Sequence, residues 1–207
     1  NILVAAAGRV DHDRLVDFVE KATAHRKSGS NRKHNAKPQF SGSRRVITRD
    51  LEQAHICVAL PGAPQLDDSR YSQALVDTVL GGATSSRLFQ EVREKRGLVY
   101  SIGSYSLSYR DGGLFLVSAG TDVRNTDEVL DLILKEIAAI RENGLTDREL
   151  GWAKAHARGT LALARESTSY RMQRLARAML YEERVVSHRE YLRRFERVKP
   201  ANIQAFA

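Results

Sequence analysis

The sequence lacks the features of three classes of protein: disulfide-bonded proteins, cysteine-rich metal-binding proteins and membrane-spanning proteins. Cys57 is the only cysteine among 207 residues, which excludes an intramolecular disulfide and the zinc modules that are built from several cysteines. No apolar run approaches the ~20 residues that a transmembrane helix needs. The opening residues NILVAAAGRV have no basic leading segment, as a signal peptide would, and resemble a buried strand, so we expect the gene product to begin upstream. These features predict a soluble intracellular protein.

The sequence also lacks a paired histidine motif for zinc. Zinc peptidases of the H-E-x-x-H and H-x-x-E-H types hold the metal with two histidines from one helix turn, and the glutamate activates water. Neither motif occurs, and no two of the six histidines lie within five residues of each other. They are His12, His25, His34, His55, His156 and His188. We therefore expect no metal or other cofactor in this chain, and no peptide hydrolysis by this chain alone.

The positive net charge of +8 comes from one segment. Residues 26–45 contain seven Lys or Arg and no acid, and the rest of the chain is nearly balanced. The segment is rich in Ser, Gly and Asn, which is typical of a solvated linker. A nucleic-acid-binding arm is the alternative, but Phe40 is its only aromatic residue for base stacking. The composition favours a linker, and we expect no nucleic-acid partner.

Hydrophobic periodicity predicts an α+β fold with a mainly antiparallel sheet packed on one side by helices. Strands are expected at 2–7, 54–61 and 99–108, and the last forms a hairpin with 113–120 around a DGG turn. Capping residues predict where six helices begin: at 11, at 67 or 68, at 84 or 85, at 125 or 126, at 146 (a T-x-x-E capping box) and at 169. A last amphipathic stretch runs through 195.

The run LGGATSSRLFQEVREKRGLVYSIGSY, residues 80–105, is the most specific motif. A glycine pair ends one helix, Thr84 or Ser85 can cap the next, and Gly97 ends that helix before a strand. This order, with these residues, resembles the C-terminal half of the mitochondrial-processing-peptidase-like branch of the pitrilysin/insulinase zinc peptidases. The resemblance covers nearly the whole chain and is strongest over 51–121.

The resemblance implies that Arg93 and Tyr100, seven residues apart, are the site residues. In that family the second domain donates an Arg and a Tyr with this spacing across a closed chamber. A guanidinium can bind a substrate carbonyl, and a phenol can stabilise the oxyanion that develops there. Spacing alone leaves a structural role open, with Arg93 paired to Glu94 and Tyr100 as a surface aromatic. Arg87 is expected to contact carboxylates, and Arg96 to favour a helix C-terminus.

The resemblance also implies the domain organisation and the partners. Residues 1–25 resemble the strand and helix that close a preceding catalytic domain, 26–45 a linker, and 46–207 the C-terminal domain. Zinc is expected in the missing N-terminal half or in a partner subunit, and the partners are that zinc-bearing half and an extended peptide, in a homo- or heterodimer. The first strand is expected either to pack with that half or to replace the last strand of the second domain. The compartment implied is the bacterial cytoplasm or the mitochondrial matrix.

Two functions follow from the resemblance. In the first, the chain is the non-zinc half of a zinc metalloendopeptidase, which binds extended peptide and supplies Arg93 and Tyr100. In the alternative, it is a non-catalytic binding or assembly domain, as in respiratory-complex core subunits, or an inactive subunit of the same family. An H-x-x-E-H motif upstream in the parent gene, or in an adjacent gene, separates the two.

Overall fold

The computed structural model describes residues 2–26 and 38–207, which form two units. The first unit contains 2–26 and 159–187, and the second contains 38–158 and 188–207. Most of the predicted linker, 27–37, lies outside the described residues, and 38–53 belongs to no helix or strand. The elements in chain order are α1 His12–Thr23, β1 Ala54–Gly62, α2 Ser69–Leu80, η1 Phe89–Glu94, β2 Val99–Ser108, β3 Gly113–Thr121, η2 Val123–Asn125, α3 Thr126–Asn143, α4 Asp147–Ala164, α5 Thr168–Glu182, α6 His188–Glu196 and α7 Pro200–Phe206.

The second unit is built on an antiparallel sheet with the strand order β1-β3-β2. The β2–β3 hairpin is closed by the predicted DGG turn, in which the Tyr109 amide donates to the Gly112 carbonyl at 2.8 Å. The predicted strands at 54–61, 99–108 and 113–120 are confirmed to within one residue. Alternation along β1 is regular, with every second residue exposed.

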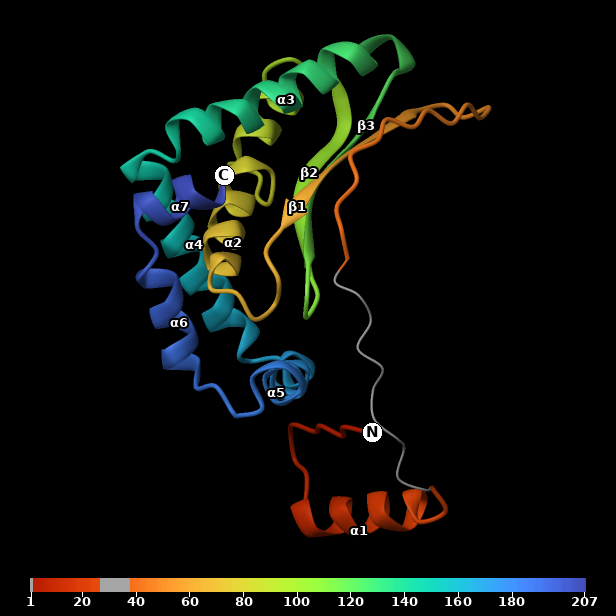
Figure 1. Ribbon diagram of the computed structural model, residues 1–207, viewed down its shortest axis with the longest axis vertical. Helices are drawn as coiled ribbons and strands as arrows, with labels where there is room; N and C mark the ends of the chain where they lie inside the picture. Colours follow the sequence, from red (N-terminus) through yellow and green to blue (C-terminus); the bar gives the residue numbers. More distant parts are fainter. Residues whose placement is uncertain (1, 27–37) are drawn as a thin grey trace. The chain divides into compact units, whose positions relative to one another are not determined.

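Helices cover one face of this sheet (Figure 1): α2, α6 and α7 lie on the same side of the strands. The buried core includes Phe115 and Val117 of β3, Leu75 of α2 and Ile133 of α3. On the opposite face, alternate side chains of β1 and β2 are exposed, including Tyr105. The predicted α+β architecture is confirmed.

The end of α2 packs directly on β2. A Cβ at Gly81 would lie 2.5 Å from the Ser104 backbone nitrogen, so only glycine permits this approach. Beside it, the Ser104 hydroxyl donates to the Asp77 side-chain carboxylate and, at 3.1 Å, to the Asp77 carbonyl. Burial raises the pKa of Asp77, and the Ser104 hydrogen bond opposes this effect. These contacts hold the strand that carries Tyr100 against α2.

The predicted capping box opens α4. The Thr146 amide donates to Glu149 Oε2 at 2.8 Å, and the Glu149 amide donates to Thr146 Oγ1 at 3.2 Å. The same carboxylate accepts two hydrogen bonds from Arg87, at 2.7 and 2.8 Å, and Glu136 lies 3.6 Å from that guanidinium. The Arg87 hydrogen bond is the largest of the causes that lower the pKa of Glu149 to about 2. Arg87 thus has the structural role that the sequence predicts.

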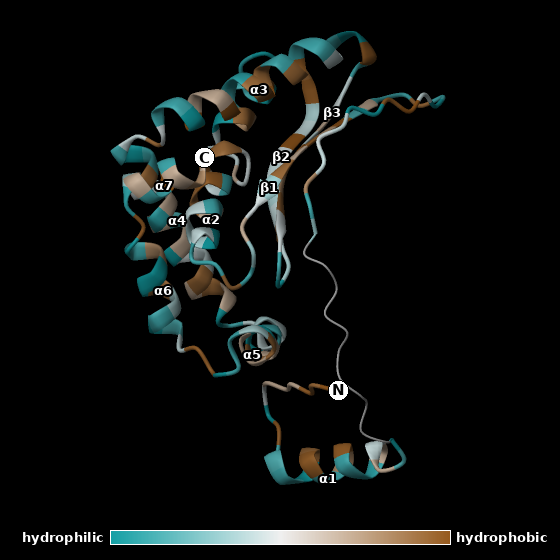
Figure 2. Ribbon diagram, viewed as in Figure 1, coloured by the Kyte–Doolittle hydropathy of each residue, from teal (hydrophilic) through white to brown (hydrophobic). Residues whose placement is uncertain are grey.

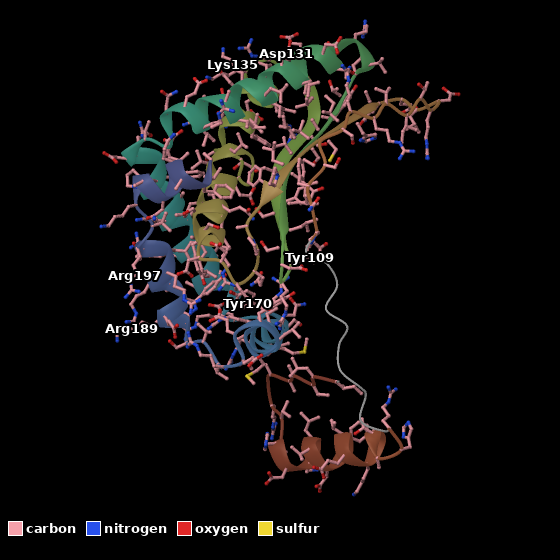
Figure 3. All side chains as sticks on the ribbon, in the orientation of Figure 1. Tyr109, Asp131, Lys135, Tyr170, Arg189 and Arg197 are labelled. Atoms are coloured by element: carbon pink, nitrogen blue, oxygen red, sulfur yellow. The ribbon has the colours of Figure 1, made fainter. Side chains whose placement is uncertain are left out.

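Some sequence predictions are wrong. Residues 2–7 form no strand and pair with none of the three strands in the described chain, so they do not replace a missing strand of this sheet. An apolar run becomes a strand only when a neighbour satisfies its backbone groups. On α3, Leu134 is 47 % exposed, whereas its neighbour Ile133 is buried. Figure 3 shows Asp131 and Lys135 projecting from the same outer side of α3. α5 is capped by Ser167 instead of Ser169, and α7 was not predicted.

The first unit has little core of its own. Asp11 caps α1 by accepting from the Arg14 amide at 3.1 Å, as its position predicts. Apolar residues recur along α1 (Figure 2), yet neither α1 nor α5 contains a buried residue, and Phe18 is 69 % exposed. The apolar residues of α5 are partly exposed as well, among them Met172, Leu175 and Met179.

Candidate functional site

Arg93 lies in a π-helical turn, where the sequence predicted an α-helix. The turn, η1, is closed by the Lys95 amide, which donates at 3.0 Å to the carbonyl of Gln90, five residues earlier. Val92 is fully buried, whereas its neighbour Arg93 is exposed. Within the described structure neither the Thr84 nor the Ser85 hydroxyl makes a hydrogen bond, so the predicted side-chain cap is absent. Single π-helical turns within helices frequently occur at functional sites.

The Arg93 guanidinium is available at the surface. Its carbon lies 4.8 Å from the centre of the Phe89 ring, one helical turn away, which is a cation–π contact. Among the described residues it makes no hydrogen bond or ion pair, and in particular none with Glu94. The cation is therefore oriented by the Phe89 ring while its N–H donors remain open to a ligand.

Tyr100 is the extra residue of a β-bulge. Val99 pairs with Thr121 and Ser101 pairs with Gly120, so Tyr100 has no partner in β3. Its side chain is 63 % exposed, and its hydroxyl forms no hydrogen bond within the part of the chain that the structure describes. Bulges re-aim side chains, and this one presents a phenol at the start of an edge strand.

The link between Arg93 and Tyr100 is anchored at Leu98. The Leu98 carbonyl accepts hydrogen bonds from Thr121 Oγ1 at 2.5 Å and from Asn125 Nδ2 at 3.5 Å. Gly97, with φ +64°, takes the left-handed conformation that ends the helical turn. Within the described residues no hydrogen bond or ion pair joins Arg93 to Tyr100. The pair is held at two ends of one anchored turn.

A further cation, Arg124, lies beside this turn. Asp122 accepts from Arg124 at its backbone amide (2.9 Å), Nε (3.1 Å) and Nη2 (3.0 Å). These bonds lower the pKa of Asp122 to about 2. The same hydrogen bonds raise the pKa of Arg124, and the charge of the Tyr100 oxygen also raises it, to a smaller extent. Sequence reasoning missed Arg124, although the hairpin register already placed the residues after β3 beside the start of β2.

The described residues do not fit a zinc ion. They contain no group of three or more His, Cys, Asp or Glu side chains that could hold a metal. The histidines of this part of the chain are scattered, as their sequence spacing indicates.

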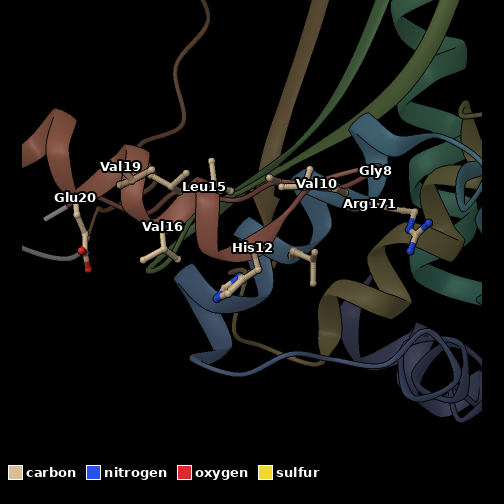
Figure 4. A pocket seen from close by; sticks show the side chains of 12 residues that line it. Gly8, Val10, His12, Leu15, Val16, Val19, Glu20 and Arg171 are labelled. Carbon is tan, nitrogen blue, oxygen red and sulfur yellow. The ribbon is translucent and has the colours of Figure 1, made fainter.

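The first unit holds an apolar groove of about 510 Å³ (Figure 4). It is lined mainly by residues between Val4 and Val19, and by Leu175 of α5. Its titratable lining residues, within the described chain, are His12, Glu20 and Arg171. The groove offers apolar contact area and is not a second candidate active site. Within residues 2–26 and 38–207, none of the helices combines the length and the apolar character that a membrane span requires.

The fold and the site define an α+β domain that presents an exposed Arg and Tyr. The chain belongs to the peptidase M16 family, because the family described as "Peptidase M16 inactive domain" matches residues 1–156. A Streptomyces coelicolor protein named an uncharacterized zinc protease is 37 % identical over 217 residues, which cover 100 % of this chain and 47 % of that protein. The Bacillus subtilis uncharacterized zinc protease YmxG is 32 % identical and covers 84 % of this chain and 42 % of its own length.

Solved structures agree with this assignment. The peptidase M16 inactive domain from Pseudomonas fluorescens superposes with a TM-score of 0.67 at 25 % identity, covering 74 % of this chain and 37 % of that one. A chain of Complex III2 from Candida albicans has the same fold, with a TM-score of 0.78 at 24 % identity over 96 % of this chain and 49 % of that one. The chain spans about half the length of the curated relatives it matches.

Proposed function

We propose that this chain is the substrate-binding, zinc-less half of a zinc-dependent endopeptidase. Arg93 and Tyr100 would donate hydrogen bonds to an extended peptide, and the catalytic metal would lie in a second half of the same family. The observation that carries the proposal is the pair itself. Both side chains are exposed at the ends of one anchored turn, and neither donates a hydrogen bond to another described residue.

The chemistry of the pair supports peptide hydrolysis. The Arg93 guanidinium presents several N–H donors, which suit a backbone carbonyl of the bound peptide. The Tyr100 hydroxyl can donate to the oxygen of the scissile carbonyl, where negative charge develops on attack. A donor aimed at that oxygen stabilises the transition state more than the ground state, so it raises kcat.

The same proposal covers the organisation of the protein. Residues 1–25 would belong with the preceding catalytic domain, 26–45 would link the halves, and 46–207 would form the C-terminal domain. The exposed apolar residues of α1 support this division, because Phe18 and its neighbours lack a core within the described chain. The zinc-bearing half is then the partner, covalently attached or as a separate subunit in a homo- or heterodimer.

A second function is a non-catalytic assembly domain. The Complex III2 chain with the same fold supports it, because that protein is part of an assembly. In that case the exposed Arg93 and Tyr100 would contribute nothing to turnover. The two functions therefore differ in one measurable quantity, the effect of these side chains on kcat.

The test uses the complete protein with both halves and a quenched-fluorescence peptide. Arg93→Ala and Tyr100→Phe should each lower kcat by about 10²-fold, the usual effect of removing one oxyanion donor, while zinc content stays unchanged. Arg148→Ala and Tyr105→Phe are matched controls, because they remove the same groups from other exposed positions and should retain kcat. Unchanged turnover in both site variants would leave the assembly function as the explanation.

A further inference from the structure

We propose that Arg124 is a specificity residue that binds a carboxylate of the peptide beside Tyr100. This inference rests on the proposed function. The hairpin register places Arg124 near Tyr100, because Val99, which precedes Tyr100, pairs with Thr121, three residues before Arg124. Asn125, next to Arg124, bonds the Leu98 carbonyl two residues before Tyr100. Thr121 and Asn125, which flank Arg124 on its two sides, are thus both tied to the start of β2.

The Arg124 guanidinium is oriented and still open. Asp122 engages Nε and Nη2 together, which fixes the plane of the guanidinium. Nη1 makes no hydrogen bond within the described structure, and the side chain is 87 % exposed. A guanidinium held on one edge in this way presents its other edge for a second, bidentate partner.

The charge around this turn selects the ligand. Arg93 and Arg96 are also exposed on the same turn, whereas Lys95 is paired with Glu91 at 2.9 Å. Arg93 and Arg96, which form no ion pair within the described residues, add positive charge to that of Arg124, which Asp122 offsets in part, so an acidic side chain is favoured over a basic one. The ligand is therefore a carboxylate, which a peptide can supply from an internal Asp or Glu or from its C-terminus.

The experiment measures peptide binding by the complete protein in the presence of a metal chelator, so that cleavage does not interfere. Fluorescence anisotropy compares peptides that differ only by Glu or Gln near the scissile bond, each with a free or an amidated C-terminus. We expect about fivefold tighter binding of a carboxylate peptide, with the advantage lost at high salt because exposed charges are screened. The amidated set shows whether the side chain or the terminus supplies the carboxylate.

Variants assign that preference to Arg124. Arg124→Ala should abolish it, Arg124→Glu should reverse it, and Arg124→Lys, which keeps the charge but not the bidentate donor edge, should keep only part of it, a graded result that a merely structural role would not produce. Arg148→Ala removes another exposed arginine, on α4, and should keep the full preference. Equal binding of all peptides by the wild type, or a preference that survives in Arg124→Ala, would overturn the inference.

The two proposals fail separately. If Arg93→Ala and Tyr100→Phe keep wild-type turnover, the catalytic proposal fails, and the binding ratios still decide the role of Arg124. If those variants lose turnover but the carboxylate preference does not depend on Arg124, only the present inference fails.

Discussion

The carboxylate of Glu149 offers the sharpest stability test, because one side chain caps α4 and pairs with Arg87. Its pKa falls from 4.5 to about 2, and its first cause is the Arg87 hydrogen bond. At ~1.36 kcal/mol per pKa unit this corresponds to roughly 3.4 kcal/mol. The two side chains are 25 and 22 % exposed, and screening by solvent reduces the expected value to about 1–2 kcal/mol.

The pH dependence follows from the sign of the shift. A carboxyl whose folded-state pKa is lowered stabilises the fold fully above the unfolded pKa, and this contribution is lost as the pH falls through the folded pKa. The Glu149 contribution should thus be complete above about pH 4.5 and disappear towards pH 2. Glu149→Gln should lower the free energy of unfolding at pH 7 by about 1–2 kcal/mol, which is ~2–8 °C in Tm.

The assay is urea unfolding of wild type and Glu149→Gln at pH 7, 4 and 3, followed by circular dichroism. The difference between them should shrink as the pH falls. Glu128→Gln, an exposed carboxylate of α3 with no hydrogen bond among the described residues, is the control and should change little. A difference that is constant from pH 7 to pH 3 would refute the role of the ionised carboxylate.

Two further predictions concern the contact between α2 and β2. Gly81→Ala should destabilise the fold by about 1–3 kcal/mol in urea unfolding, because its Cβ would lie 2.5 Å from the Ser104 nitrogen. Gly151→Ala, where a Cβ meets nothing within 4 Å, should not destabilise, and equal losses would contradict the clash. Asp77 has a raised pKa, so its ionised form costs stability as the pH rises. Asp77→Asn keeps an acceptor for Ser104 and should gain about 1 kcal/mol at pH 7; a clear loss would contradict this.

The sequence predicts much of this fold because its local signals agree with one another. Alternation in 99–108, the apolar run in 113–121 and the intervening DGG turn predict the hairpin, which the structure contains. The T-x-x-E capping box marks the start of α4, and both of its reciprocal bonds are present. Those elements depend on neighbours in the chain, which a pattern records.

Other features depend on packing that no pattern records. Residues 2–7 have strand composition but no partner strand in the described chain. The π-helical turn at Phe89–Glu94 keeps Val92 buried and Arg93 exposed, and its sequence looks like an ordinary α-helix. The bulge at Tyr100 and the orientation of Arg124 by Asp122 likewise arise from the hairpin as a whole.

Turnover by the Tyr100→Phe variant tests the central proposal most directly, since it removes one hydroxyl and little else. In the complete, metal-loaded protein we expect kcat for a quenched-fluorescence peptide to fall by about 10²-fold, with zinc content unchanged. Tyr105→Phe, from the same strand, should retain full activity. A Tyr100→Phe variant with wild-type kcat would contradict the assignment of the exposed Arg93 and Tyr100 pair to catalysis.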